Sequence, residues 1–167
     1  SPDGCGCVVA NFDKITFQSS TTNVTWLNIQ GTTSTNGSVQ HSGTHYFGMA
    51  KTQQTISTSG HFEWTYDGEP IVVGLGNNDD EQVSTGYNDL PYSFSGNIRE
   101  FGVYKAEGNL VAGDRVRIEI DASGVVRYKK NGQLVYTSQT PASGQYYLVF
   151  KSQEVAGYSI STATVGS

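Results

Sequence analysis

Polar and aromatic side chains that could bind a ligand gather in two segments without a strand pattern. The longer segment, residues 76–90, is rich in amides and carboxylates, which hydrogen-bond hydroxyl groups. A tyrosine ring in it offers a flat surface for the apolar face of a sugar. Because binding residues concentrate in connections, we predict glycan contacts from Asn77, Asn78, Asp80 and Tyr87, with His45 and Tyr46 in a second binding loop. The alternative is that these tyrosines only cap the ends of the fold.

The acidic part of the longer segment offers oxygen ligands of the kind that calcium prefers. Asp79 and Asp80 follow two asparagines and precede a glutamate, and carboxylate and amide oxygens are common ligands of Ca²⁺. Their spacing is not that of an EF-hand loop, and a solvated turn is the simpler interpretation. The sequence therefore requires no cofactor, and calcium at Asp79 and Asp80 is the metal site that it suggests.

Both cysteines, Cys5 and Cys7, lie near the start of the sequence. A disulfide between residues two apart is strained, and two thiols without a nearby histidine do not complete a zinc site. Three interpretations stay open: a tight Cys5–Cys7 bridge, disulfides between chains, and pairing with a segment outside this sequence. Oxidised thiols would indicate an oxidising compartment.

Composition excludes several classes of partner. The 167 residues suit one sandwich domain, with residues 1–20 as a leader and first strands. The net charge is -5 and the basic residues are scattered, which argues against nucleic acid and anionic membrane surfaces. No apolar run approaches the roughly 20 residues that cross a bilayer. The many glycine, serine, threonine and asparagine residues are typical of a turn-rich β protein outside the cell.

Short alternating segments run along the chain, and no window has a helical period. The clearest is residues 115–120, which alternate polar and apolar side chains and precede the β-branched residues 125–129. Asn131-Gly132 then predicts a type I′ hairpin turn before residues 133–137. Further strands are expected at residues 24–29, 39–41, 46–50, 54–57, 61–66, 71–75, 92–94, 98–104, 146–150 and 158–161, with a turn region at 32–38. Such closely spaced strands predict an all-β sandwich of two antiparallel sheets, with Trp26 and Trp64 in its core.

The order of these segments resembles the concanavalin A-like jelly-roll sandwiches, and within them the SPRY-like group of secreted and cell-surface domains. The resemblance covers residues 22–162 and is more specific for the fold than for a ligand. It implies a concanavalin A-like jelly roll, in a superfamily that includes lectins, glucanases and protein-binding modules. The segments that carry it are Val24-Thr25-Trp26, Gly60-His61-Phe62-Glu63-Trp64, Val73-Gly74-Leu75, Tyr87-Asn88-Asp89-Leu90-Pro91-Tyr92, Gly113-Asp114-Arg115-Val116 and Val126-Arg127-Tyr128-Lys129-Lys130-Asn131-Gly132.

The resemblance also implies how a glucanase would arrange its carboxylates. Retaining glucanases of this broad fold carry two glutamates on one strand, in a Glu-x-Asp-x-Glu type of spacing. Neither the segment 63–67 nor the segment 119–121 has that spacing. His41, His45 and His61 lie beside no nucleophile motif. We therefore predict a binding module and not an enzyme.

The sequence as a whole predicts an extracellular, lectin-like module that is secreted or lies on the cell surface and recognises a glycan or polysaccharide. The alternative is a structural or adhesive protein-binding module that self-assembles into homo-oligomers, through a sheet face or the segment of Cys5 and Cys7. A glycoside hydrolase is the third alternative. If the loop at residues 76–89 is not the binding site, the concave face of a sheet is the next place to expect it.

Overall fold

The computed structural model describes residues 20–43, 46–77, 89–153 and 157–167. The predicted site residues Asn77 and Tyr46 lie within these ranges. Within them, the chain forms no helix long and apolar enough to span a membrane. The other residues for which the sequence predicts a role lie outside the described ranges: Cys5, Cys7, His45, Asn78, Asp79, Asp80 and Tyr87.

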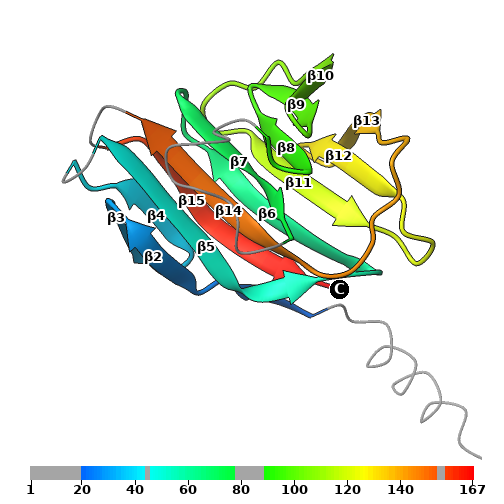
Figure 1. The fold of residues 1–167 in the computed structure, drawn as a ribbon, viewed down its shortest axis with the longest axis horizontal. Coiled ribbons are helices and arrows are strands. Elements are labelled where there is room, and N and C mark those ends of the chain that lie inside the picture. Colours follow the sequence, from blue (N-terminus) through cyan, green and yellow to red (C-terminus); the bar gives the residue numbers. More distant parts are fainter. Residues whose placement is uncertain (1–19, 44–45, 78–88, 154–156) are drawn as a thin grey trace, which may run out of the picture.

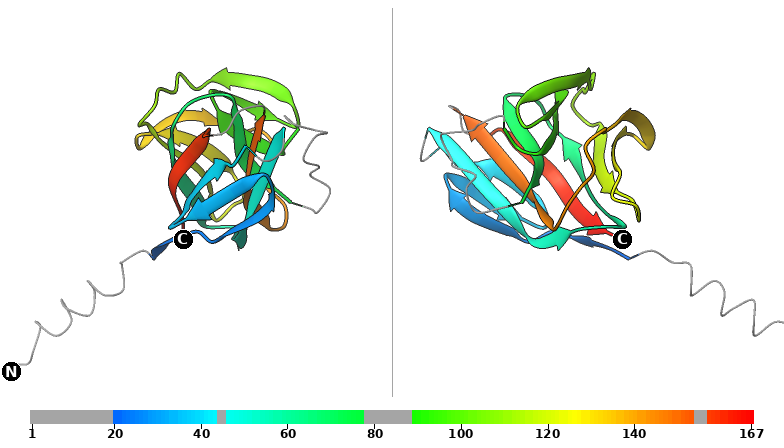
Figure 2. Two further views of the ribbon diagram at one scale, coloured as in Figure 1. Left: turned by 90° about the vertical axis from the view of Figure 1, so that its left-hand side faces the viewer. Right: turned by 45° about the vertical axis from the view of Figure 1, so that its right-hand side comes forward.

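The described residues form two antiparallel sheets that pack face to face as a sandwich (Figures 1 and 2). Sheet A has the strand order β13-β12-β11-β6-β15-β4-β3, with β1 also paired to β15, and sheet B has the order β10-β9-β8-β7-β14-β5-β2. The strands of sheet A are β1 (Thr21–Asn23), β3 (Thr32–Thr35), β4 (Ser38–His41), β6 (Gly60–Tyr66), β11 (Arg115–Ile120), β12 (Val126–Lys130), β13 (Gln133–Thr137) and β15 (Ser159–Gly166). Those of sheet B are β2 (Trp26–Gln30), β5 (Phe47–Ile56), β7 (Ile71–Gly76), β8 (Tyr92–Ser95), β9 (Asn97–Glu100), β10 (Val103–Glu107) and β14 (Tyr146–Gln153).

The core between the sheets follows from the alternation of side chains along each strand. In β11, the residues with even numbers are buried and those with odd numbers are partly exposed. Phe62 and Trp64 of the neighbouring β6 are fully buried, and Trp26 is also in the core, as the sequence predicted. Successive side chains of a strand point to opposite faces. The odd-numbered residues of β11 therefore lie on the outer face of sheet A.

The two ends of the sandwich are built differently. At one end the chain passes directly from β2 to β3, and the Asn28 side chain donates a 3.1 Å hydrogen bond to the Ser34 hydroxyl. At the other end, β10 and β13 are the outermost strands of the two sheets. Here the Lys130 ammonium donates a 3.2 Å hydrogen bond to the Asn109 carbonyl. The second end therefore exposes two strand edges side by side.

The predicted hairpin at Asn131-Gly132 is confirmed. Asn131 has φ 50° and Gly132 has φ 82°, and β12 pairs with β13 across this turn. These values are those of a type I′ turn, which requires positive φ at both central positions. This turn fixes the register of β12 and β13, and so sets which of their side chains face outward.

The turn predicted over residues 32–38 and the continuous strand predicted over residues 98–104 were wrong. Residues 32–38 contain β3 and the start of β4, joined by Asn36-Gly37, which has φ 48° and 84°. β-Branched threonines favour a strand, and Asn-Gly is a hairpin signal in its own right. Residues 98–104 are not one strand, because Phe101 (φ 51°) and Gly102 (φ 81°) turn the chain between β9 and β10. Phenylalanine rarely adopts positive φ, so its presence at position 101 did not indicate a turn in the sequence.

The outer face of sheet B has its own small apolar cluster. It consists of Met49, Val72, Leu90 and Val149, with Tyr147 packed against it. Leu90 is fully buried although it lies at the end of the connection from β7 to β8. The end of that connection is therefore held against the outer face of sheet B.

Candidate binding face on sheet A

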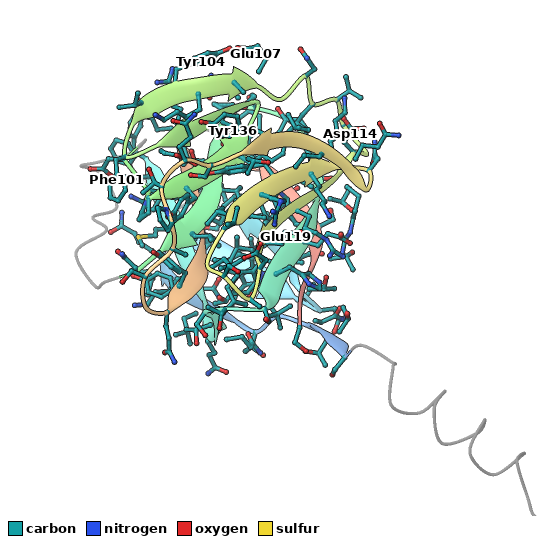
Figure 3. All side chains as sticks on the ribbon, turned by 90° about the vertical axis from the view of Figure 1, so that its right-hand side faces the viewer. Phe101, Tyr104, Glu107, Asp114, Glu119 and Tyr136 are labelled. Atoms are coloured by element: carbon teal, nitrogen blue, oxygen red, sulfur yellow. The ribbon has the colours of Figure 1, made fainter. Side chains whose placement is uncertain are left out.

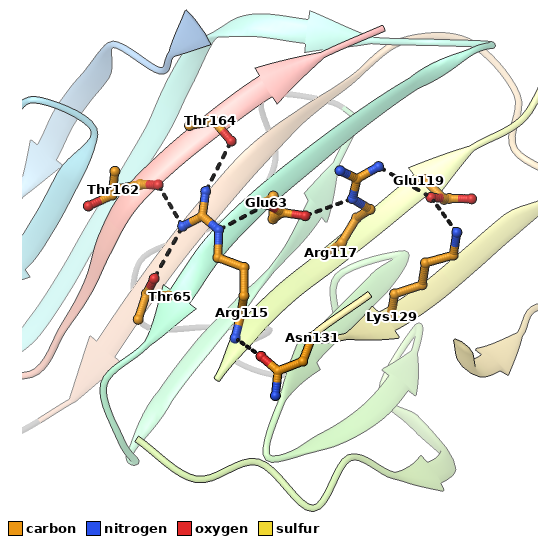
Figure 4. A network of polar contacts seen from close by, with 9 residues as sticks. All are labelled: Glu63, Thr65, Arg115, Arg117, Glu119, Lys129, Asn131, Thr162 and Thr164. Carbon is orange, nitrogen blue, oxygen red and sulfur yellow. Dashed lines mark hydrogen bonds and ion pairs between the residues drawn. The ribbon is translucent and has the colours of Figure 1, made fainter. Parts of the chain in front are cut away.

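The outer face of sheet A carries a network of charged and hydroxyl side chains from four adjacent strands (Figure 4). Strand pairing places Glu63 of β6 between Arg117 of β11 and Thr164 of β15. It places Lys129 of β12 opposite Arg117. Residues that face each other across strands share one side of a sheet. The network is therefore a continuous polar surface.

Arg115 is the structural anchor of this network. Its Nε donates to Glu63 Oε1 at 2.9 Å and its Nη1 donates to Thr65 Oγ1 and to the Thr162 carbonyl. Its Nη2 donates to Thr164 Oγ1 at 3.2 Å. All three nitrogens of the guanidinium are thus engaged by β6 and β15. Arg115 joins strands that are distant in sequence and has little capacity left for a ligand.

Arg117 makes one short hydrogen bond, through Nε, and one longer ion pair, through Nη1. Its Nε donates to Glu63 Oε2 at 2.8 Å. Within the described residues, no hydrogen bond reaches Nη1 or Nη2, and Nη1 lies 3.6 Å from Glu119 Oε1. Lys129 Nζ lies 3.2 Å from that same oxygen. Nη2 of Arg117 is therefore without a partner among the described residues, and Nη1 has only the long contact with Glu119.

A hollow of about 310 Å³ opens next to Arg117 on the same face. Its lining includes Thr21, Ser59, His61, Arg117 and Glu119. It thus brings together hydroxyls, an imidazole, a guanidinium and a carboxylate. A polar hollow with both donors and acceptors suits a ligand that also has both, since neither set is left unpaired.

The position of His61 depends on a glycine in the neighbouring strand. His61 pairs with Gly166 of β15, and a Cβ atom at Gly166 would lie 2.5 Å from His61 Cε1. No side-chain atom could approach the ring that closely. The His61 ring therefore occupies space that is free only because residue 166 is a glycine. The imidazole consequently rests on the backbone of β15 at the edge of the hollow.

Two groups on this face, Glu63 and His61, have pKa values shifted by their surroundings. Burial tends to raise the pKa of Glu63, but hydrogen bonds from Arg117 and Arg115 outweigh it and hold the pKa below its ordinary value. Burial, assisted by the charge of Arg117, lowers the pKa of His61. At neutral pH, Glu63 is therefore a carboxylate and His61 is a neutral imidazole.

A second hollow of about 270 Å³ lies on the same outer face toward the other end of sheet A, over β3, β4 and β15. Asp67 borders this region, where its Oδ2 accepts hydrogen bonds from the Ser159 and Ser161 hydroxyls at 2.8 and 2.6 Å. The hollow is mainly hydroxyl and amide in character. The side chains that line it are those of Thr33, Ser34, Thr35, Ser38, Val39, Gln40, Ser159, Ile160 and Ser161.

Among the described residues, the carboxylates of Glu63, Glu119 and Glu69 do not have the environments of a glycosidase pair. Such a pair needs a general acid whose pKa is raised next to an ionised partner. The pKa of Glu63 is lowered, and Glu119 is paired with two cations. Burial does raise the pKa of Glu69, but this carboxylate accepts a hydrogen bond from the Ile71 backbone N–H, and Tyr66 bonds to it as well. Glu69 therefore stabilises the turn between β6 and β7.

A different kind of surface lies at the open end of the sandwich, away from Glu119 (Figure 3). Phe101, Val103 and Tyr104 of the β9–β10 hairpin are 60, 56 and 47% exposed, and Leu134 of β13 is 56% exposed. We call Phe101, Val103 and Tyr104 the hairpin patch. The Arg99 guanidinium lies 6.0 Å from the centre of the Tyr104 ring. Exposed apolar groups of this kind are typical of contacts with other macromolecules.

The predicted site residues that the structure describes are not brought together. Asn77 follows Gly76, which pairs with Tyr147 at one end of β14. Tyr46 precedes Phe47, which pairs with Gln153 at the other end of β14. The two positions are therefore about 20 Å apart along that strand, at roughly 3.3 Å per residue. Tyr46 is 55% exposed, and its ring makes an edge contact with Phe47 at 4.7 Å between centroids.

The residues around the hollow were not among the predicted contacts. The alternation in residues 115–120 does place Arg115, Arg117 and Glu119 on one face. It does not reveal their partner, because Glu63 is 54 residues from Arg117 in sequence. Among the described residues, no group of three or more His, Cys, Asp or Glu side chains is arranged to hold a metal ion.

Comparisons with known proteins reveal similarities of structure. No protein-family model matches the chain, and no curated protein sequence matches it. A human SPRY domain is 17% identical, with a TM-score of 0.59 over 81% of this chain and 94% of that one. The PSpry domain of TRIM65 is 12% identical, with a TM-score of 0.62 over 86% and 90% of the two chains. The carbohydrate recognition domain of Emp47p is 9% identical, with a TM-score of 0.56 over 89% and 96%.

These identities are low, so the likeness is one of fold. SPRY domains and a carbohydrate recognition domain match most of the chain, and each match covers at least nine-tenths of the other protein's domain. The chain therefore has the concanavalin A-like sandwich fold that its sequence predicted, in a form similar to SPRY domains and lectin-type recognition domains.

Proposed function

We propose that this chain is a carbohydrate-binding module that holds a glycan on the outer face of sheet A. The observation that carries the proposal is the hollow beside Arg117, which combines His61, Glu119 and Ser59 with that guanidinium. Sugar hydroxyls both donate and accept hydrogen bonds, so they match a site that offers both kinds of group. His61, which is largely buried, borders this hollow as a neutral imidazole.

The second hollow extends the proposed site across the face. A polysaccharide has several sugars in a row, and successive sugars could contact the hydroxyls of Ser159 and Ser161 as well as the first hollow. The fold supports the proposal in a general way, since the Emp47p domain that it resembles is described as a carbohydrate recognition domain. We further propose that the module acts outside the cell, in keeping with its low content of charged residues, 15%.

The module is proposed to bind without catalysis. Glycoside hydrolysis needs one carboxylic acid that stays protonated near neutral pH. On the proposed face, Glu63 is ionised, because Arg117 and Arg115 lower its pKa, and Glu119 is paired with Lys129. Both carboxylates are therefore suited to accept hydrogen bonds from hydroxyls rather than to donate a proton.

The test is a glycan array probed with the chain in multivalent form, because single sugar sites bind weakly and gain from avidity. We expect binding to a defined set of glycans that the free sugar competes away. His61→Ala and Ser59→Ala, each checked for an unchanged fold, should weaken it. Tyr87→Ala and Asp80→Ala test the rival site in the loop at residues 76–89. Loss of binding in these two variants alone would move the site to that loop, and failure on every glycan would refute the carbohydrate function.

A second candidate function, protein binding, is favoured by the hairpin patch. Among the described residues, Phe101, Val103 and Tyr104 of the β9–β10 hairpin and Leu134 of the edge strand β13 are exposed large apolar side chains. Phe101 adopts φ 51° although it is exposed and makes no contact with the core cluster. A strained, exposed aromatic residue at a hairpin tip is a typical binding feature. We propose self-association through this patch as the alternative, and sedimentation of the wild type and Phe101→Asn over a concentration series tests it.

A further inference from the structure

The two arginines at the centre of the sheet A network differ in a way that points to the chemistry of the ligand. Arg115 uses all three of its nitrogens on protein groups. Arg117 uses Nε on Glu63, while among the described residues its Nη1 and Nη2 receive no hydrogen-bond partner. Nη2 has no partner among the described residues and Nη1 has only the 3.6 Å ion pair with Glu119, so both terminal nitrogens can still donate to the two oxygens of a carboxylate, which accept two parallel hydrogen bonds.

The surroundings of Arg117 add to its attraction for an anion. Arg115, Arg117 and Lys129 are balanced by the two carboxylates of Glu63 and Glu119, so the network carries one net positive charge. The chain as a whole has a net charge of -5. Lys129 has a single ion pair, at 3.2 Å, and an ammonium has three protons to donate. The face is thus locally positive on an acidic protein.

The rest of the hollow is suited to hydroxyl groups rather than to charge. Ser59 and Thr21 present hydroxyls. Glu119 pairs with Arg117 and Lys129 through Oε1, while its Oε2 makes no hydrogen bond or ion pair with another described residue. A ligand with one acid group and several hydroxyls would therefore find a partner for each of them within this one hollow.

We propose that the glycan bound on this face carries a carboxylate, as uronic acids and sialic acids do, and that Arg117 binds that carboxylate with its two terminal nitrogens. This inference rests on the proposed carbohydrate function. In it, Lys129 supplies the second positive charge, and Glu119 and Ser59 bond the hydroxyls of the same sugar.

The experiment compares ligands that differ only in the acid group. The immobilised probes are polygalacturonate, the same polymer after methyl esterification, a sialyllactose conjugate, sulfated dextran and neutral dextran, at about 150 mM salt to screen long-range attraction. We expect binding to polygalacturonate or to sialyllactose, which also distinguishes the two sources of carboxylate. The methyl ester should bind at least about tenfold more weakly, because it keeps the hydroxyls and loses the charge.

Variants then assign the contact to Arg117. Arg117→Gln should weaken binding about tenfold or more, and Arg117→Lys should be intermediate because it keeps the charge and loses the fork. Arg127→Gln is the matched control, since Arg127 lies on the same face but is paired with Asp121 at 2.7 Å. We expect it to stay within about twofold of the wild type, with thermal melting and circular dichroism used to verify that every variant is folded.

The outcomes separate the two proposals. Equal binding of the acid and its methyl ester, or equal or tighter binding of sulfated dextran, would overturn the carboxylate inference. So would wild-type affinity in Arg117→Gln or an equal loss in Arg127→Gln. Binding to neutral glycans alone, lost in His61→Ala, would leave the carbohydrate function in place and refute only the carboxylate. No binding to any probe and no hit on the glycan array would refute both.

Discussion

The Tyr128 hydroxyl donates a 2.7 Å hydrogen bond to Glu100 Oε2 in the interior of the sandwich. The same carboxylate accepts a 3.0 Å bond from the Ser138 hydroxyl through Oε1. Glu100 comes from the end of β9 and Tyr128 from β12, so the pair joins sheet B to sheet A. Glu100 also directly precedes the turn at Phe101, and it therefore anchors the hairpin patch to the core.

Replacing Tyr128 with phenylalanine should lower the free energy of unfolding by about 1–3 kcal/mol, because it leaves a buried carboxylate oxygen without its donor. The ring and its packing against Phe94 would remain. Urea denaturation followed by fluorescence measures the change. Tyr136→Phe is the control, since that side chain is only partly buried, and a loss there as large as in Tyr128→Phe would contradict the explanation.

The turn at Gly132 allows a test of backbone strain alone. Gly132 has φ 82°, and a Cβ atom at this position would meet nothing within 4 Å. Gly132→Val should therefore lower the free energy of unfolding by about 1–2 kcal/mol without any steric clash. Gly132→Asn should cost less, because asparagine tolerates positive φ. Identical melting temperatures for wild type and Gly132→Val would rule out a strained turn.

Replacing Phe101 should change the free energy of unfolding in the opposite direction. Since Phe101 has φ 51° and is 60% exposed, Phe101→Asn should raise the free energy of unfolding, by up to about 1 kcal/mol, through a better type I′ turn. Phe101→Leu removes the ring but keeps a residue unsuited to positive φ, so it should gain nothing. Thermal melts compare the three proteins. A destabilised Phe101→Asn would mean that the ring contributes to the fold, and the second candidate function would lose its support.

The stability of the protein should depend on pH through His61. Burial and Arg117 lower its pKa in the folded state below the ordinary value of 6.5. The unfolded chain then binds more protons than the folded one as the pH falls through this range. The contribution of neutral His61 is complete above about pH 6.5 and decreases as the pH falls through its lowered pKa. The Glu63 carboxylate, whose pKa is also lowered, contributes above about pH 4.5 and is lost in a more acidic window.

Melting temperatures of wild type and His61→Gln between about pH 8 and pH 5 measure this dependence. We expect the wild type to lose stability more steeply below about pH 6.5 than the variant. Parallel curves would show that His61 does not have a lowered pKa. Because both proteins keep Glu63, a shared decline near the acidic end of the series is expected and does not affect the comparison.

Much of the fold was predictable from local patterns. The alternation in residues 115–120 and the Asn-Gly turn at 131–132 each depend on neighbours in the sequence, since side-chain direction and turn geometry are set over two to four residues. Trp26 and Trp64 were correctly assigned to the core for the same reason. The turn at Phe101 was missed because its residue type opposes the conformation that the surrounding strands impose.

The binding face was decided by the tertiary structure. A sequence pattern shows that Arg115, Arg117 and Glu119 share a face, but not what lies beside them. Pairing of β11 with β6 and of β6 with β15 brings Glu63 and Thr164 to Arg115, and leaves Arg117 with fewer hydrogen bonds than Arg115. Strand pairing between distant segments depends on the packing of the whole sandwich, because each ladder forms only when both sheets can bury their inner faces. The sequence by itself thus determined the elements and the class of fold, and only the assembled sheets determined which charges are satisfied and which remain free to bind.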